Sequence, residues 1–158
     1  MHNMKQTVYF FFLLMMLTLT GTGPITAKAP ERKATTVDDI YKLVNKYRQS
    51  KGLKPLKLHE TINKEAAKHS RNMATGSVAF GHDGFNSRFD RLAKAIPNAT
   101  SMAENVQYTS GNAAHVVDNW IHSPVHKKNM EGDYNLTGIG IATSSSGQVY
   151  YTQIFIKN

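Results

Sequence analysis

The stretch that decides the fold class is the end of the chain, Leu136-Thr-Gly-Ile-Gly-Ile-Ala142 followed by Gln148-Val-Tyr-Tyr-Thr-Gln-Ile-Phe-Ile156. Both runs are rich in β-branched and aromatic residues, and the segment Ser144-Ser-Ser-Gly147 between them is typical of a turn. The pattern predicts a β-hairpin. Because the helical patterns all precede it, without strand–helix alternation, the sequence predicts an α+β fold with an antiparallel sheet.

Upstream of this hairpin, apolar residues recur at helical spacing in several segments. Thr36 is expected to cap the first helix, Ser87 the third, and Gly52 to follow the end of the first. Residues 53–58 read as an extended link, and residues 101–108 as a strand or an extended strip. The predicted helices are 37–50, 60–74, 88–96 and 112–121.

Composition excludes several classes of protein. The 158 residues contain no cysteine, which rules out a disulfide scaffold, a thiolate nucleophile, a cysteine zinc site and an iron–sulfur cluster. The net charge of +8 fits a nucleic acid partner, an anionic envelope or simple solubility, and composition does not choose among them. Basic residues are scattered without aromatic interleaving, so nucleic acid is an unlikely partner.

The first 27 residues have the pattern of an export signal. Lys5 precedes the apolar run Val8–Leu17, and small residues lead to a cleavage site expected after Ala27. The run is about 10 residues long, against roughly 20 for a membrane span, although an uncleaved anchor is the alternative. We therefore expect a signal peptide at 1–27, a polar tether at 28–35 and a single domain at 36–158. The predicted product is a secreted or extracytoplasmic monomer whose mature chain has no transmembrane span.

Two histidines are candidates for chemistry. His82 lies between glycines in Phe80-Gly-His-Asp-Gly84, where the backbone can approach a ligand closely. His126 lies in Ser123-Pro-Val-His126, which predicts a helix start with Ser123 as N-cap, its hydroxyl used in the cap. The positive end of a helix disfavours imidazolium, which suits a metal ligand or a general base. His69, on the inward side of a predicted helix, is expected to be packed rather than a ligand.

Glu104 is the third candidate. It lies in the otherwise apolar strip Met102-Ala-Glu-Asn-Val106, which predicts a buried carboxylate. Such a group needs a partner or a raised pKa, and a nearby histidine would supply the partner. The alternative is a structural carboxylate bonded to backbone amides.

The order of these motifs resembles the CAP superfamily, also called the SCP domain, which includes cysteine-rich secretory proteins, antigen 5 and pathogenesis-related 1 proteins. The similarity runs from Val37 to Phe155. Its elements are Val44-Asn-Lys-Tyr-Arg48, Gly52-Leu-Lys-Pro-Leu56, Ala67-Lys-His-Ser70 with Met73-Ala74, Gly81-His82, Arg91-Leu92, Ala103-Glu-Asn-Val106, Trp120-Ile-His-Ser-Pro-Val-His126 with Asn129, Gly138-Ile-Gly140 and Tyr151-Thr-Gln-Ile-Phe155.

The resemblance implies a three-layer α–β–α sandwich with a central antiparallel sheet and a cleft that gathers two histidines and two acids. His82 and His126 match the histidines and Glu104 matches one acid, whereas Ser123 takes the place of the second. Family members hold a divalent cation between the histidines. The resemblance therefore implies weak binding of a cation, zinc or magnesium, by His82 and His126.

Three functions remain open. The first is a secreted binding module for a small, lipid-like or envelope-derived ligand, including an anionic envelope polymer. The second is a metal-assisted hydrolase in which His82 and His126 hold the cation and Glu104 acts on water. The third is a histidine–glutamate network that only stabilises the fold.

Overall fold

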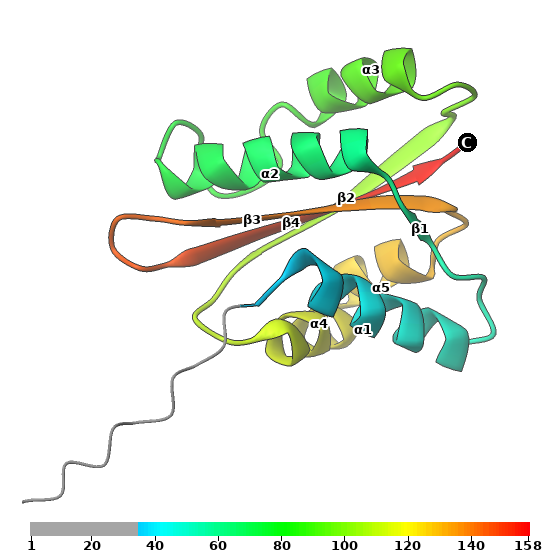
Figure 1. Ribbon diagram of the computed structural model, residues 1–158, viewed down its shortest axis with the longest axis horizontal. Helices are drawn as coiled ribbons and strands as arrows, with labels where there is room; N and C mark the ends of the chain where they lie inside the picture. The colour runs from blue at the N-terminus through cyan, green and yellow to red at the C-terminus, as the bar shows by residue number, and fades with distance from the viewer. Residues whose placement is uncertain (1–34) are drawn as a thin grey trace, which may run out of the picture. The chain divides into compact units, whose positions relative to one another are not determined.

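The computed structural model describes residues 35–158, and these form three layers (Figure 1). A four-stranded sheet has α2 and α3 on one face and α1, α4 and α5 on the other. This arrangement confirms the predicted α–β–α sandwich. The elements are α1 (Val37–Ser50), β1 (Lys57–Leu58), α2 (Glu60–Ala74), α3 (Phe85–Ala95), β2 (Ser101–Tyr108), α4 (Ala113–His122), α5 (Pro124–Glu131), β3 (Leu136–Thr143) and β4 (Val149–Lys157).

The sheet has the strand order β1-β3-β4-β2. The hairpin predicted at the end of the chain is β3 and β4, and β2 pairs antiparallel with β4 from Ser101 opposite Lys157 to Tyr108 opposite Tyr150. The two-residue β1 joins parallel to β3, so the sheet is mixed, with its three long strands antiparallel as expected. Strand β2 is an edge strand, and this edge position shapes the candidate site.

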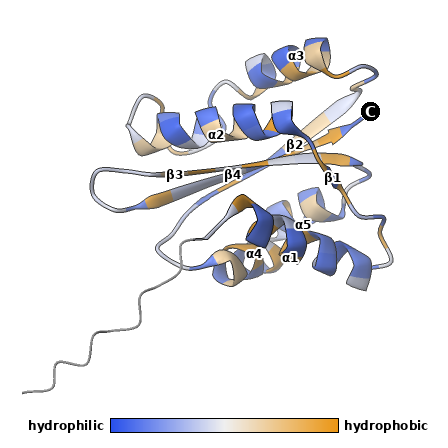
Figure 2. Cartoon of the chain, viewed as in Figure 1, coloured by the Kyte–Doolittle hydropathy of each residue, from blue (hydrophilic) through white to orange (hydrophobic). Residues whose placement is uncertain are grey.

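Both faces of the sheet are buried, which explains why β4 is apolar or buried almost throughout. Trp120 of α4 and Ile40 of α1 pack with Phe155 on one face. Ile62 of α2 and Leu92 of α3 pack with Ile154 on the other. Figure 2 shows the hydrophilic residues along the helices and apolar stretches within the sheet. Apolar side chains therefore leave water on both sides of one sheet.

Helix α2 lies directly on β3 because two glycines leave room for it. A Cβ atom on Gly138 would overlap the backbone of Ile62, and one on Gly140 would overlap the backbone of Ala66. The Gly138-Ile-Gly140 motif is thus a contact surface for a helix rather than a turn.

Two polar residues of α1 join this helix to the rest of its layer. Asn45 bonds both the backbone N–H and the carbonyl of Leu56. The buried Arg48 donates to the carbonyls of Lys54, Met130 and Gly132 at 2.6–3.0 Å. The Val44–Arg48 motif therefore has a structural role, since it fixes backbone that would otherwise lack partners.

Most predicted boundaries agree with the structure. Thr36 forms a capping box with Asp39, α2 begins and ends where expected, and Gly52 has a φ of 72°. The third helix begins at Phe85 rather than after Ser87, because Gly84, with a φ of 76°, takes the N-cap position that the sequence assigned to Ser87. Glycine adopts that conformation without steric cost.

The predicted signal peptide, its cleavage site and residues 28–34 of the tether lie outside the described residues. Within residues 35–158, no helix is long and apolar enough to cross a membrane.

Candidate functional site

The centre of the site is the carboxylate of Glu104, in the middle of β2. Its side chain is 0% exposed. Arg88 of α3 donates from Nε to Oε2 at 2.8 Å and from Nη2 to Oε1 at 2.6 Å. His82 Nδ1 lies 2.9 Å from Oε1. Burial raises the pKa of Glu104, but the hydrogen bonds from His82 and Arg88 outweigh it, so its pKa is lowered and the carboxylate is ionised.

Arg88 also holds the loop that carries His82. Its Nη1 donates to the carbonyl of Asp83 at 2.6 Å, and its Nη2 lies 3.4 Å from the carbonyl of His82. A guanidinium presents several donors in one rigid plane, so a single buried side chain can bind the carboxylate and the loop together. Arg88 thereby fixes His82 relative to Glu104.

His69 of α2 completes the buried network in a defined protonation state. Its Nε2 lies 2.8 Å from the carbonyl of Gly81, which only accepts, so Nε2 carries the proton. Its Nδ1 lies 3.2 Å from Arg88 Nη1, which only donates, so Nδ1 is unprotonated. Burial lowers the pKa of His69, in agreement with a neutral ring. The prediction that His69 is packed is confirmed.

The environment of His82 determines which of its nitrogens faces outward. Because an ionised carboxylate only accepts, Nδ1–H donates to Glu104. When the ring is neutral, the lone pair is then on Nε2. The side chain is 49% exposed, so Nε2 is accessible to a ligand. A carboxylate on the far nitrogen is the arrangement that orients metal-binding histidines.

His126 reaches the same region from the other helical layer. It is the third residue of α5, after Ser123 as N-cap and Pro124 as first residue, as the sequence predicted. Asn105 Nδ2 donates to the carbonyl of His126 at 3.1 Å, and Asn129 Nδ2 donates to the carbonyl of Glu104 at 3.1 Å. These bonds hold α5 against β2.

The pKa of His126 is lowered, first by burial and second by the charge of His82. The neutral form of His126 is therefore favoured. Glu104 and Asn105 are adjacent, so their side chains point to opposite faces of the sheet. His82 and Glu104 are thus joined by a hydrogen bond in one layer, and His126 lies in the other layer, on a helix that is hydrogen-bonded to the same strand, β2.

The hydroxyl of Ser123 departs from its prediction. Ser123 is the N-cap of α5, but its side chain makes no capping hydrogen bond within the described residues. The expectation that the hydroxyl is used in the cap was therefore wrong. Its backbone is extended, with φ −91° and ψ 116°, and Lys127 N–H bonds its carbonyl.

Sequence reasoning missed Arg88 as a member of the site. The available signal was its position four residues before the buried Leu92, which places both side chains on one face of α3. An arginine on the inward face of a helix requires a buried acceptor, and Glu104 was the acid predicted to be buried.

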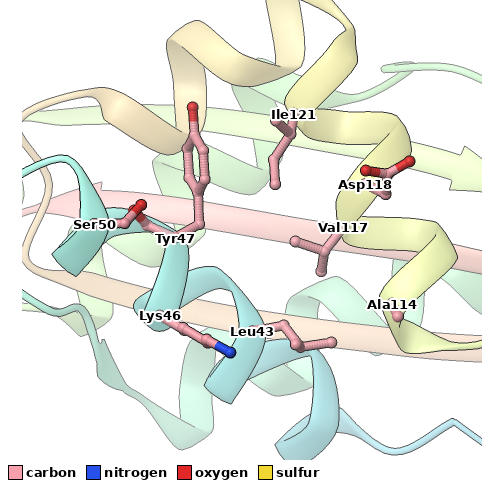
Figure 3. A pocket seen from close by; sticks show the side chains of 8 residues that line it. All are labelled: Leu43, Lys46, Tyr47, Ser50, Ala114, Val117, Asp118 and Ile121. Carbon is pink, nitrogen blue, oxygen red and sulfur yellow. The ribbon is translucent and has the colours of Figure 1, made fainter.

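A second feature is an apolar groove between α1 and α4, in the helical layer opposite to α2 and α3 (Figure 3). It has a volume of about 290 Å³. Leu43, Val117 and Ile121 form its walls, and Lys46 and Asp118 lie at its rim.

With this geometry in view, comparison with known proteins assigns the family. The family model of the cysteine-rich secretory protein family, CAP, matches residues 41–155. The chain belongs to the CAP family. The predicted resemblance is therefore confirmed, and the mixed sheet between helices is the CAP fold.

Three bacterial proteins illustrate the similarity to this chain. The uncharacterized protein YkwD of Bacillus subtilis (strain 168) is 32% identical over 139 residues, which cover 87% of this chain and 51% of that protein. A cysteine-rich secretory protein from Staphylococcus aureus has a TM-score of 0.64 and 25% identity over 77% of this chain and 38% of its own. An extracellular protein containing an SCP domain from Bacillus anthracis has a TM-score of 0.64 and 23% identity over 77% of this chain and 40% of its own.

This CAP chain spans about half of the curated relative it matches, and less of the two solved structures. Those proteins contain further sequence outside the matched domain, so the activity of each whole protein is not assigned to this chain. The likeness to the Bacillus anthracis structure concerns the fold alone.

Proposed function

We propose that this protein is a secreted CAP-domain binding module, which holds a small, lipid-like or envelope-derived ligand, rather than a catalyst. The observation that carries the proposal is the engagement of Glu104. Both of its oxygens accept hydrogen bonds from Arg88 or His82, and its side chain is fully buried. A carboxylate with a lowered pKa and no access to solvent is a poor base, so its role is to orient His82.

The nitrogens left for a ligand are His82 Nε2 and an imidazole nitrogen of His126. Two imidazoles with water fit a weakly held divalent cation, zinc rather than magnesium, because magnesium prefers oxygen ligands. Within residues 35–158, no three histidine or acidic side chains gather closely enough to hold a metal ion. A structural zinc site has four protein ligands, so we expect at most an open, weakly binding site here.

The groove between α1 and α4 supports the lipid-like part of the proposal. Its walls suit an acyl chain, and the rim carries one charge of each sign, Lys46 and Asp118, which suits a polar head group (Figure 3). The net charge of +8 also favours anionic ligands.

A zinc titration by calorimetry tests the histidine site. His82→Ala and His126→Ala are compared with wild type and with His115→Ala, which removes an exposed imidazole of α4. We expect the first two variants to lose binding and His115→Ala to keep it. Equal titration of all four folded proteins would contradict the proposal that the histidines bind a cation.

A second titration, with a long-chain fatty acid, tests the groove. Ala114→Trp would fill the space between α1 and α4, whereas Ala93→Trp places the same side chain on the exposed face of α3. We expect binding to be lost only in Ala114→Trp. Binding that is unchanged in Ala114→Trp would exclude the groove.

The alternative is a metal-assisted hydrolase. It is favoured by the exposed ring of His82 and by the lowered pKa of His126, because neutral imidazoles can hold a cation. The test is hydrolysis of a simple ester or peptide with zinc present. Turnover that disappears in folded His126→Ala would establish the alternative, and the absence of turnover in wild type would remove it.

A further inference from the structure

A cluster of aromatic side chains lies on the surface beyond the histidine–glutamate network. Phe80 comes from the loop after α2, Tyr108 ends β2, and Tyr150 lies near the start of β4. The Phe80 and Tyr108 rings meet edge to face with centroids 4.8 Å apart. Tyr150 lies 5.9 Å from Tyr108 and 6.4 Å from Phe80. We call these three residues the aromatic platform.

Two of the three aromatic residues of the platform are exposed, and Tyr150 is half-buried. Phe80 is 49% exposed and Tyr108 is 52% exposed. They are two of the four large hydrophobic residues that are exposed among residues 35–158. Contiguous exposed aromatic surface is uncommon on a protein without a partner and marks interaction sites. Because the rings pack on one another, a ligand would not need to order them.

The platform is continuous with the site proposed above. Tyr108 and Glu104 are four residues apart on β2, so their side chains share one face of the sheet, about 13 Å apart at roughly 3.3 Å per residue. Tyr150 is the direct partner of Tyr108 and shares that face. Phe80 is two residues before His82, in the loop that His69 holds through the carbonyl of Gly81. A ligand extending from His82 would therefore meet the rings.

The chemistry of the rings limits the class of ligand that the aromatic platform can bind. A spacing of 4.8 Å leaves no room for a quaternary ammonium between Phe80 and Tyr108, as an aromatic cage would need. Within the described residues, the hydroxyls of Tyr108 and Tyr150 have no protein partner, so both can bond a ligand. A partner with flat C–H faces and a rim of hydroxyls meets both requirements, since C–H groups lie against the negative face of a ring.

We propose that the aromatic platform binds the sugar rings of an envelope polysaccharide. This inference rests on the proposed binding function and names a ligand class for it. Because the Phe80 and Tyr108 rings are nearly perpendicular, at 86°, a single exposed ring face would lie against each pyranose face. The two tyrosine hydroxyls would bond sugar hydroxyls, and the chain would continue toward His82.

Two probes test the inference. One is cell-wall peptidoglycan stripped of proteins and anionic polymers, in a sedimentation assay, and the other is soluble tetra-N-acetylglucosamine, by calorimetry. Phe80→Ala and Tyr108→Ala are compared with wild type. The control is Leu58→Ala, which removes an exposed apolar side chain at the opposite edge of the sheet. We expect each platform variant to weaken binding roughly tenfold, equivalent to about 1.4 kcal/mol, and the control to bind like wild type.

Three results would overturn the inference. One is a wild-type protein that binds neither peptidoglycan nor tetra-N-acetylglucosamine. Another is full binding by folded Tyr108→Ala. The third is binding only to walls that keep their anionic polymers, unchanged in Tyr108→Ala and lost at high salt, which would assign recognition to charge.

The same variants separate this inference from the proposed function. Zinc titration is expected to be unchanged in Tyr108→Ala and lost in His82→Ala. If zinc binds but neither glycan probe does, the platform inference is wrong and the histidine site stands. If the glycan binds through the rings and zinc does not bind, the cation site is wrong and the platform stands.

Discussion

Arg88 and Glu104 form a two-point ion pair inside the protein, with Nε–Oε2 at 2.8 Å and Nη2–Oε1 at 2.6 Å. Both side chains are at most 5% exposed. The pair joins α3 to β2, and Arg88 also bonds the carbonyl of Asp83 in the loop that carries His82. The position of His82, a candidate metal-binding residue, therefore depends on Arg88, which is not itself a candidate for binding the metal.

Loss of Arg88 is expected to destabilise the fold strongly. Arg88→Ala leaves the buried Glu104 carboxylate with His82 as its one side-chain hydrogen-bond partner among the described residues, so we expect the free energy of unfolding to fall by about 3–5 kcal/mol. Arg91→Ala is the matched control, because Arg91 lies on the same helix and pairs with Glu65 with its side chain 47% exposed. It is expected to cost at most about 1 kcal/mol. Urea unfolding followed by the fluorescence of the buried Trp120 measures both, and equal losses would contradict the assigned role.

Stability is expected to fall in mild acid. Burial lowers the pKa of His69 and His126 below the ordinary 6.5, so the unfolded chain binds protons that the folded protein does not. The stabilisation is complete above pH 6.5 and is lost as the pH falls below it. Glu104, with a lowered pKa, adds a loss in the same direction below about pH 4.5.

Urea unfolding at several pH values between 7.5 and 4 would measure this dependence on acid. In His69→Gln, the side-chain amide can donate to the carbonyl of Gly81 without titrating. This variant should therefore show a shallower decline. A wild-type free energy of unfolding that stays constant across the range would show that these histidines are not held neutral.

Tyr47 is expected to ionise at a higher pH than an ordinary tyrosine. Burial and its 2.6 Å hydrogen bond to Glu131 raise the pKa of Tyr47 to about 12, from an ordinary value of 10.0. Because the folded state retains this proton, the associated stability is present below pH 10 and is lost as the pH rises toward 12. The absorbance of tyrosinate, compared between wild type and Tyr47→Phe, isolates this group. A difference curve with its midpoint near pH 10 would contradict the prediction.

The contact between α2 and β3 should not tolerate a methyl group. Gly140→Ala places a Cβ against the backbone of Ala66, and backbone cannot move aside as a flexible side chain can. We expect a loss of about 1–3 kcal/mol or more. Gly52→Ala is the control, because its φ is 72° but a Cβ there meets no atom within 4 Å, so only conformational strain of about 1–2 kcal/mol applies. Thermal unfolding measures the loss of stability in both variants. A smaller loss in Gly140→Ala than in Gly52→Ala would contradict the close contact between α2 and β3.

The sequence predicted the helices and strands well where local signals specify them. Thr36 with Asp39 defines the start of α1, and Gly52 follows its end. The β-branched and aromatic residues of 148–156 predicted a strand, and residues 101–108 were predicted to be a strand or an extended strip; both segments are strands. The start of α3 was misplaced because the conformation of Gly84, rather than a polar side chain, sets it.

The candidate site was predicted only in part. His82, His126 and Glu104 were visible as polar residues in glycine-rich, helix-start and apolar contexts. The placement of these residues in the fold depends on contacts between distant parts of the chain. Arg88 bonds Glu104 across 16 positions, and Asn105 bonds the His126 carbonyl across 21. No local pattern encodes such pairs.

What the sequence alone determined was the identity and order of the elements and the CAP pattern, because caps, glycines and apolar periodicity act over a few residues. Tertiary structure decided that β2 is the edge strand, so that the two helical layers could place His82 and His126 around it. It also decided that Arg88, and not a backbone amide, neutralises Glu104. A buried charge must find an opposite charge wherever the folded chain brings one close.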